Sequence, residues 1–223
     1  MTSYQDDVRL LETELSGVLR TFQNLSASDW ARPTLLRPLD ETRPPWTVFE
    51  LAGHFDISIG LTRMLISSAQ QGQVGRDRVS FFIFPRSEHA PVVYDYAYTM
   101  VEGKTPEQMP AVLAETFGKT IEEARATPPE VVGSGYYALM RLDEFVPSRV
   151  VEAVVHGFDL TDALGRDPIA TPEGIAATAG ILDELLARRT VAGRPTDLAD
   201  DTAWVRAASG RAEHPDPRLP LIG

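Results

Sequence analysis

The sequence predicts an all-α fold, a bundle of long helices followed by a short C-terminal tail. Apolar residues recur at helical spacing in several long stretches of the chain. Helix-start signals precede these stretches and Pro- or Gly-rich joints follow them, while strand-like segments are few. A chain of 223 residues fits one domain with a small appendage. We therefore expect a helical bundle over residues 1–195 and a tail over 196–223 that packs on it.

The first two helices have clear sequence patterns. An apolar stripe predicts a helix over residues 6–25, and a Pro-rich connector follows it. Thr47 and Glu50 then form a capping box, in which each side chain satisfies a free backbone N–H of the first turn. This box predicts a second helix over residues 48–71.

The middle of the chain is less regular. Residues 73–104 are compatible with a strand or a helix, and we expect a short helix there. Thr105 begins another capping pattern, with Pro106 in the first turn, which predicts a third long helix up to about residue 126. A flexible joint is expected at 133–135, which reads Gly-Ser-Gly.

The last third contains two further predicted helices. The fourth is expected over residues 147–164, with Gly165 just beyond its end. The fifth is expected over 171–189. In the tail, the short apolar segment 203–205 is interpreted as a strand and the remainder as Pro-rich coil.

Composition excludes several classes of function. The 21 basic and 32 acidic side chains give a net charge of −11, which argues against nucleic acid as a partner. The absence of Cys excludes disulfides, thiolate metal sites and a cysteine nucleophile, so any metal must bind through nitrogen and oxygen. No long uncharged apolar stretch and no leader pattern are visible, so we expect no membrane partner and a cytoplasmic location.

A polar stripe on the fourth predicted helix is the first candidate site. Glu152 and His156 are four residues apart, a spacing that lets two side chains approach one metal ion from one helix face. Arg149 and Asp159 continue the stripe, and a solvated face with ordinary ion pairs explains the same pattern. Asp159 is either an orienting partner of His156 or an exposed surface acid. For Arg149 we favour a structural salt bridge.

His54 on the second predicted helix strengthens the metal interpretation. Its neighbours on the helix face are apolar, which predicts a buried imidazole. A buried imidazole needs a partner, and a carbonyl or carboxylate would serve as well as a metal. Facing helices of a bundle are roughly 8–10 Å apart, which would let His54 approach Glu152 and His156. Three nitrogen or oxygen ligands leave an open position, as catalytic zinc sites do.

These residues lie in motifs that resemble the mycothiol-dependent maleylpyruvate isomerase family of the DinB-like superfamily. The first motif is Trp46-Thr47-Val48-x-x-Leu51-Ala52-Gly53-His54. The second is Pro147-Ser148-Arg149-Val150-Val151-Glu152-x-x-x-His156-x-x-Asp159-Leu160. The tail segment 204–211 and the early segment 25–30 are also similar to the family.

The resemblance implies a DinB-like four-helix bundle with one divalent metal. It assigns His54, Glu152 and His156 as the ligands, with zinc as the usual ion and nickel as an alternative. It implies a low-molecular-weight thiol, mycothiol or a similar one, as co-substrate. The reaction would be isomerisation of a cis double bond by reversible thiol addition, or transfer of the thiol to an electrophile. The other partner would be a small-molecule electrophile or an unsaturated acid.

Arginines are the candidate anion-binding residues. Arg211 lies in the tail motif and could bind a substrate or cofactor carboxylate, so we treat it as a candidate catalytic and cofactor-binding residue. Arg86 is a second candidate for cofactor binding, although a surface position explains it as well. Several aromatic residues could wall a pocket or simply pack a helix joint. They are Phe81, Phe82, Phe84, Tyr94, Tyr96 and Tyr98.

Two other functional classes share much of this sequence evidence. A non-catalytic protein could use the same metal and pocket to capture a ligand. A purely structural bundle would carry the polar stripe on its solvated face. The sequence is compatible with a monomer or a homodimer.

Overall fold

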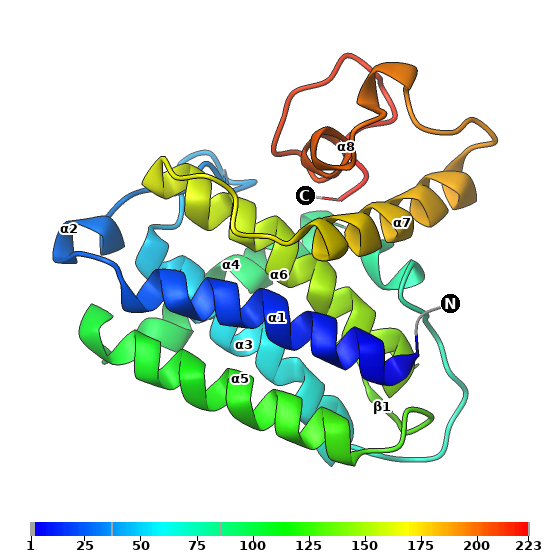
Figure 1. The fold of residues 1–223 in the computed structure, drawn as a ribbon, viewed down its shortest axis with the longest axis horizontal. Coiled ribbons are helices and arrows are strands. Elements are labelled where there is room, and N and C mark those ends of the chain that lie inside the picture. Colours follow the sequence, from blue (N-terminus) through cyan, green and yellow to red (C-terminus); the bar gives the residue numbers. More distant parts are fainter. Residues whose placement is uncertain (1–2, 37, 85, 223) are drawn as a thin grey trace.

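The computed structural model describes residues 3–36, 38–84 and 86–222, and it confirms the all-α fold. The main helices of the bundle are α1 (Tyr4–Gln23), α3 (Val48–Ser67), α5 (Met109–Ala126) and α6 (Leu142–Leu164). Helices α1 and α3 each pack against both α5 and α6, which makes a four-helix bundle (Figure 1). The shorter elements are α2 (Ala27–Trp30), α4 (Arg86–Val101) and the 3₁₀ turns η1 (Ser80–Phe82), η2 (Pro106–Gln108) and η3 (Thr196–Leu198).

Two C-terminal helices extend the bundle on one side. Helix α7 (Pro172–Arg189) packs on α6, and α8 (Asp201–Ala208) packs on α7 (Figure 1). The strand predicted at 203–205 is wrong, because Asp200 caps a helix there by accepting a hydrogen bond from the amide of Ala203. Within the described residues, no helix is long and apolar enough to cross a membrane.

The structure corrects several predicted boundaries. Helix α3 ends at Ser67, short of the predicted residue 71. Helix α6 begins at Leu142, five residues earlier than predicted, with Pro147 inside the helix. Acidic side chains in its first turn, Asp143 and Glu144, favour this early start because they lie near the positive end of the helix dipole.

A small hairpin replaces the predicted flexible joint. Strands β1 (Val132–Ser134) and β2 (Leu139–Arg141) pair antiparallel, with Gly133 opposite Met140. A Cβ at Gly133 would overlap the carbonyl oxygen of Leu65 on α3, so this strand lies against the helix backbone only because residue 133 is glycine. The turn of the hairpin carries Tyr136 and Tyr137 toward the candidate site described below.

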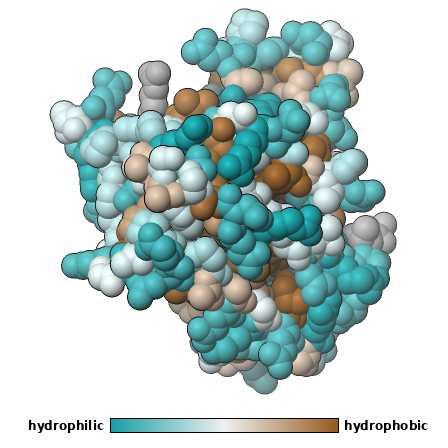
Figure 2. Space-filling model, turned by 60° about the vertical axis from the view of Figure 1, so that its left-hand side comes forward, coloured by the Kyte–Doolittle hydropathy of each residue, from teal (hydrophilic) through white to brown (hydrophobic). Residues whose placement is uncertain are grey.

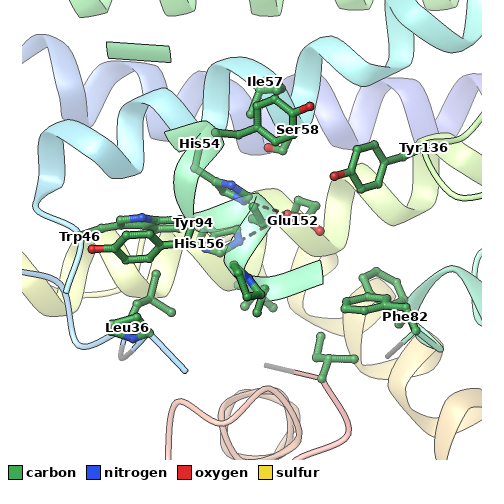
Figure 3. A pocket seen from close by; sticks show the side chains of 18 of the residues that line it. Leu36, Trp46, His54, Ile57, Ser58, Phe82, Tyr94, Tyr136, Glu152 and His156 are labelled. Atoms are coloured by element: carbon green, nitrogen blue, oxygen red, sulfur yellow. Dashed lines mark hydrogen bonds and ion pairs between the residues drawn. The ribbon is translucent and has the colours of Figure 1, made fainter. Parts of the chain in front are cut away.

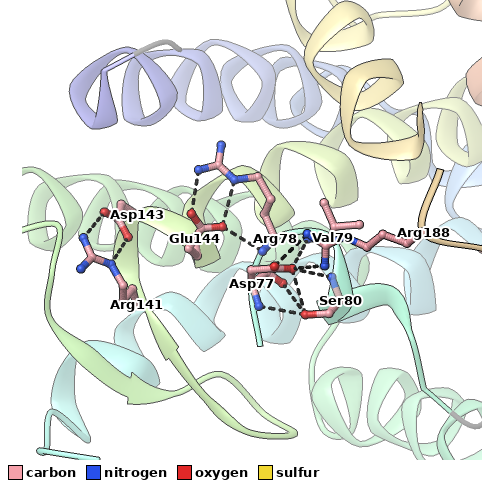
Figure 4. A network of polar contacts seen from close by, with 8 residues as sticks. All are labelled: Asp77, Arg78, Val79, Ser80, Arg141, Asp143, Glu144 and Arg188. Atoms are coloured by element: carbon pink, nitrogen blue, oxygen red, sulfur yellow. Dashed lines mark hydrogen bonds and ion pairs between the residues drawn. The ribbon is translucent and has the colours of Figure 1, made fainter. Parts of the chain in front are cut away.

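Polar contacts fix the segment that leads into η1 (Figure 4). Glu144 of α6 accepts hydrogen bonds from the guanidinium and the amide of Arg78. Asp77 pairs with Arg188 of α7 and accepts hydrogen bonds from Ser80. Burial acts to raise the pKa of Asp77, but these partners outweigh it and hold the pKa well below its usual value. Because α6 and α7 both anchor the segment, the aromatic residues of η1 have a defined position.

The carboxylate of Glu14 on α1 is buried, and its protonation makes the stability of the fold depend on pH. Its side chain accepts hydrogen bonds from the backbone and the hydroxyl of Thr171, the N-cap of α7, and the residue is 3% exposed. Burial raises its pKa above 4.5, although the bonds from Thr171 act in the opposite direction. The protonated form of Glu14 therefore contributes its full stabilisation of the folded state below pH 4.5. This contribution is lost as the pH rises through the raised pKa of Glu14.

We expect Glu14→Gln to raise the Tm by a few degrees at pH 7 and to have little effect at pH 4, because Gln carries no charge to desolvate. Thermal melts followed by circular dichroism between pH 4 and 8 measure this. Glu122→Gln, at an exposed position of α5, is the control and should show no pH-dependent difference. A Glu14→Gln effect that is the same at every pH would contradict the prediction.

Candidate metal centre

Three side chains from two helices converge in the bundle, as the sequence predicts. His54 lies on α3, and Glu152 and His156 lie one turn apart on α6 (Figure 3). Oε2 of Glu152 is 3.4 Å from Nε2 of His54 and 3.4 Å from Nε2 of His156. One ligand atom from each residue lies within 4.8 Å of the other two. The side chains are between 8% and 17% exposed, so the group is sheltered but accessible.

The donor set and its spacing fit a divalent metal ion. A separation of 3.4 Å is too long for a strong hydrogen bond. Two ligands bound about 2.0–2.1 Å from one tetrahedral ion are separated by roughly 3.4 Å. The residues therefore leave the space between them that an ion with two imidazole ligands and one carboxylate requires. Nδ1 of His54 is buried and has no hydrogen-bond partner, so the contact of this ring with Glu152 is made by Nε2.

Asp159 holds His156 in its orientation. Oδ2 of Asp159 is 2.8 Å from Nδ1 of His156, and this leaves Nε2 facing Glu152. Asp159 is only 2% exposed, so the prediction of an exposed surface acid is wrong. A carboxylate on the far nitrogen of a histidine is the usual second partner of a metal-binding imidazole.

Arg211 reaches Asp159 from the C-terminal tail. Its Nε and Nη2 donate to the two carboxylate oxygens of Asp159 at 2.9 and 2.7 Å, and its Nη1 donates to the carbonyl of Ser209 at 2.5 Å. Burial acts to raise the pKa of Asp159, but the charges of Arg211 and His156 outweigh it and lower the pKa to about 2. Asp159 therefore remains an anion that accepts the Nδ1 proton of His156. The prediction that Arg211 contacts a substrate or cofactor stays a prediction.

Burial and mutual charge set the protonation of the three candidate ligands. Burial lowers the pKa of His54, and the nearby His156 lowers it further. Burial alone would raise the pKa of Glu152, but hydrogen bonds from both imidazoles and the charge of Arg149 bring it well below 4.5. Burial would lower the pKa of His156, but Asp159 and Glu152 outweigh this and raise it. Glu152 is thus ionised and His54 is neutral, which are the forms that bind a metal, whereas His156 would lose its Nε2 proton when an ion binds.

Arg149 lies beside the candidate ligands, one turn before Glu152 on α6. Its side chain is 1% exposed and packs against the rings of Phe81 and Phe145, with its guanidinium carbon 4.7 and 4.6 Å from their centres. Nη1 donates to the carbonyl of Ser58, and Nη2 lies 3.9 Å from Oε1 of Glu152 without a hydrogen-bond partner. The interpretation of the stripe as a solvated face is therefore wrong, because Arg149 and Asp159 are both buried.

A cavity of about 270 Å³ opens next to the three candidate ligands. Helices α3, α4 and α6 line it, together with η1, the connector before α3, the hairpin turn and the tail. Of the aromatic residues proposed as a wall, all except Tyr98 line the cavity. Sequence reasoning missed Tyr136 and Tyr137 as lining residues; their only signal is the Gly-rich turn that precedes them. Arg86 begins α4, and its side chain lies outside the described part of the structure.

Comparison with known proteins identifies a related family. A family model described as the mycothiol maleylpyruvate isomerase N-terminal domain matches residues 11–161. This range contains His54, Glu152 and His156, whereas Arg211 lies beyond it. No curated protein and no solved structure matches the chain.

Proposed function

Because the chain belongs to the mycothiol maleylpyruvate isomerase family, we propose that it is a metal-dependent enzyme that uses mycothiol or a similar thiol. His54, Glu152 and His156 would hold the ion, with zinc as our choice and nickel as the alternative. The observation that carries the proposal is the convergence of two imidazole nitrogens and one carboxylate oxygen beside an apolar cavity. The reaction would be addition of the thiol to an electrophile, either as net S-transfer or as a step in isomerising a cis double bond.

The metal and the chain would have separate roles in this reaction. A bound divalent ion supplies Lewis acidity, which favours the ionised form of a thiol at neutral pH. Two imidazoles and a single carboxylate would leave the ion with net positive charge and at least one open position. The chain contains no Cys, so the reacting sulfur must come from the small thiol.

The residues around the candidate ligands would keep the site ordered. Asp159 accepts a hydrogen bond from Nδ1 of His156, which would leave Nε2 available to hold the ion. Arg211 holds Asp159, and we assign it this positioning role in addition to its predicted contact with a ligand. The indole of Trp46 stacks on His54 at 5.1 Å between ring centres, which restricts the orientation of the imidazole. These contacts place the two imidazoles before any ion binds.

The proposal is tested by metal analysis combined with turnover. We expect purified protein to contain close to one equivalent of zinc or nickel, and a chelator to lower its Tm. Maleylpyruvate and a generic thiol-reactive electrophile should be converted only when both metal and mycothiol are present. Protein without metal and with an unchanged Tm in chelator would refute the metal site. Metal binding without turnover of either substrate would instead favour the non-catalytic binding protein.

Replacing Asp159 with Asn should weaken metal affinity about 10–100-fold, the usual cost of losing the outer partner of a metal-binding histidine. Competition with a chromogenic chelator measures this without any assay of activity. Asp162→Asn is a matched control, because Asp162 lies on the same helix and pairs with Arg206 but not with a candidate ligand. Equal losses of affinity in both variants would mean that Asp159 acts only through the net charge of the helix.

A further inference from the structure

We propose that Arg149 and Ser58 form a subsite that binds one carboxylate of an unsaturated acid, one helical turn away from the candidate metal ligands. The inference rests on the proposed function, because it names the residues that would hold the acid at that same site. Two unpaired hydrogen-bond donors in the buried wall of the cavity carry it. The subsite adds contact with a ligand to the structural role that the sequence predicts for Arg149.

The cavity has a mainly apolar lining, in which an unpaired polar atom stands out. Near the surface, Leu39 and Tyr96 line it and remain 46% and 42% exposed. On the face shown in Figure 2, hydrophobic residues lie in hollows of a mainly hydrophilic surface. In a site of this kind, a few polar groups placed in an apolar wall orient the ligand. Unpaired polar atoms of the wall are therefore candidate contacts of a ligand.

Two such atoms lie close together between α3 and α6. Nη2 of Arg149 and Oγ of Ser58 are buried without a hydrogen-bond partner, in residues that are 1% and 4% exposed. Both residues line the cavity, and Nη1 of Arg149 donates to the carbonyl of Ser58 at 3.0 Å. Among the described lining residues, Trp46 and His54 hold the other unpaired atoms, and their rings stack on each other.

A ligand oxygen would relieve both unpaired donors of the subsite. A buried donor without a partner is costly, and the cost is greater when the group is charged. Nη2 of Arg149 lies 3.9 Å from Oε1 of Glu152, which is too long for a hydrogen bond. A carboxylate has two acceptor oxygens, so it can accept from the guanidinium and from the hydroxyl at once.

The subsite and the candidate metal ligands occupy successive turns of the same two helices. Ser58 follows His54 by one turn on α3, and Arg149 precedes Glu152 by one turn on α6. Figure 3 shows Ser58 and His54 along α3, with Glu152 on the facing helix. Each pair is joined across the two helices, at 3.4 Å for the metal ligands and 3.0 Å for the subsite. Successive turns are about 5.4 Å apart, a distance that a short unsaturated acid spans.

The charges of the metal-loaded site also favour a carboxylate at Arg149. Neutral imidazoles add no charge to a divalent ion, and Glu152 as its ligand would cancel only one of the two positive charges. Arg149 adds another positive charge, since a guanidinium stays protonated in proteins. An ionised thiol and one carboxylate would therefore leave the site close to neutral. The second carboxylate of a dicarboxylic acid would extend along the cavity, whose wall also contains Arg43 and Arg211.

Removal of the Ser58 hydroxyl tests the subsite with little disturbance of the fold. We expect Ser58→Ala to keep the zinc content and the Tm, because the hydroxyl has no partner to lose. Maleate binding to the zinc-loaded protein, measured by isothermal titration calorimetry, should weaken about tenfold through loss of a hydrogen bond to a charged group. Thr62→Val is the matched control, because Oγ1 of Thr62 is also buried and unpaired on α3 but the residue does not line the cavity.

Replacing Arg149 tests the charge of the subsite. Arg149→Met should weaken maleate binding about 100-fold, because it removes the positive charge together with the donor. Binding of mycothiol should be unchanged in this variant and in Ser58→Ala, because the subsite holds the acid. If Arg149→Met does not fold, Ser58→Ala decides alone.

Several results would overturn the inference. They are absence of maleate binding with and without zinc, unchanged maleate affinity in Ser58→Ala, an equal loss in Thr62→Val, and a loss confined to mycothiol binding. Repeating the titrations after treatment with a chelator separates this inference from the proposed function. Maleate binding that still falls in Ser58→Ala supports the subsite even if the metal site is refuted. Zinc binding with a maleate affinity that neither substitution changes refutes the subsite alone.

Discussion

Glu152→Gln is expected to abolish metal binding at micromolar metal and to remove thiol-dependent turnover. Glu152 is the residue shared by both close contacts of the site, with its Oε2 3.4 Å from each imidazole. Gln has nearly the same shape but no charge, so only the two neutral imidazoles would remain as good ligands. Loss of a direct ligand should exceed the 10–100-fold cost of losing an outer partner.

Two measurements check the Glu152→Gln prediction. Metal content of the purified variant should fall to background, and the Tm should no longer respond to a chelator. A ligand present at 1,000 times its Kd stabilises the folded state by about 4 kcal/mol, so this response should be large in the unmodified protein. Glu144→Gln is the control, because Glu144 lies on the same helix and pairs with Arg78 away from the site. A variant that retains one equivalent of metal would show that Glu152 is not a ligand.

The local parts of the fold could be predicted from the sequence. Capping at Thr47 and the apolar periodicity of the bundle helices depend on near neighbours in the chain, and both are confirmed. The convergence of His54 with Glu152 and His156 was also predicted, because the positions lie on facing helices of the bundle. Metal binding itself stays a proposal.

The incorrect predictions concern segments whose structure depends on contacts with residues far away in the sequence. The 203–205 segment is helical because it is capped by Asp200 and packs on α7, although three apolar residues alone resemble a strand. The hairpin at Gly133 depends on close contact with the backbone of α3, which a Gly-rich sequence does not reveal. The burial of Asp159 in the polar stripe of α6 also depends on a residue far away in the sequence, because Arg211 from the tail pairs with it.

Arg211→Ala is expected to destabilise the folded protein by about 3–5 kcal/mol, the usual cost of leaving one member of a buried ion pair alone. Arg211 is 9% exposed and Asp159 is 2% exposed, so water cannot replace the lost partner well. The cost should come mainly from the unpaired anion rather than from the lost side chain. Adding Asp159→Asn to this variant should therefore restore a large part of the stability, even though it removes a second polar contact.

A double-mutant cycle measured by urea unfolding, with and without chelator, decides between two roles for Arg211. If Arg211 acts through Asp159, the effects of the two substitutions on the free energy of unfolding will be strongly non-additive. Arg211→Ala will then also lower metal affinity, because an unpaired Asp159 would shift toward its neutral form and hold His156 less firmly. Additive effects with unchanged metal affinity would refute the positioning role. They would leave contact with a ligand as the remaining role of Arg211 at the cavity that it lines.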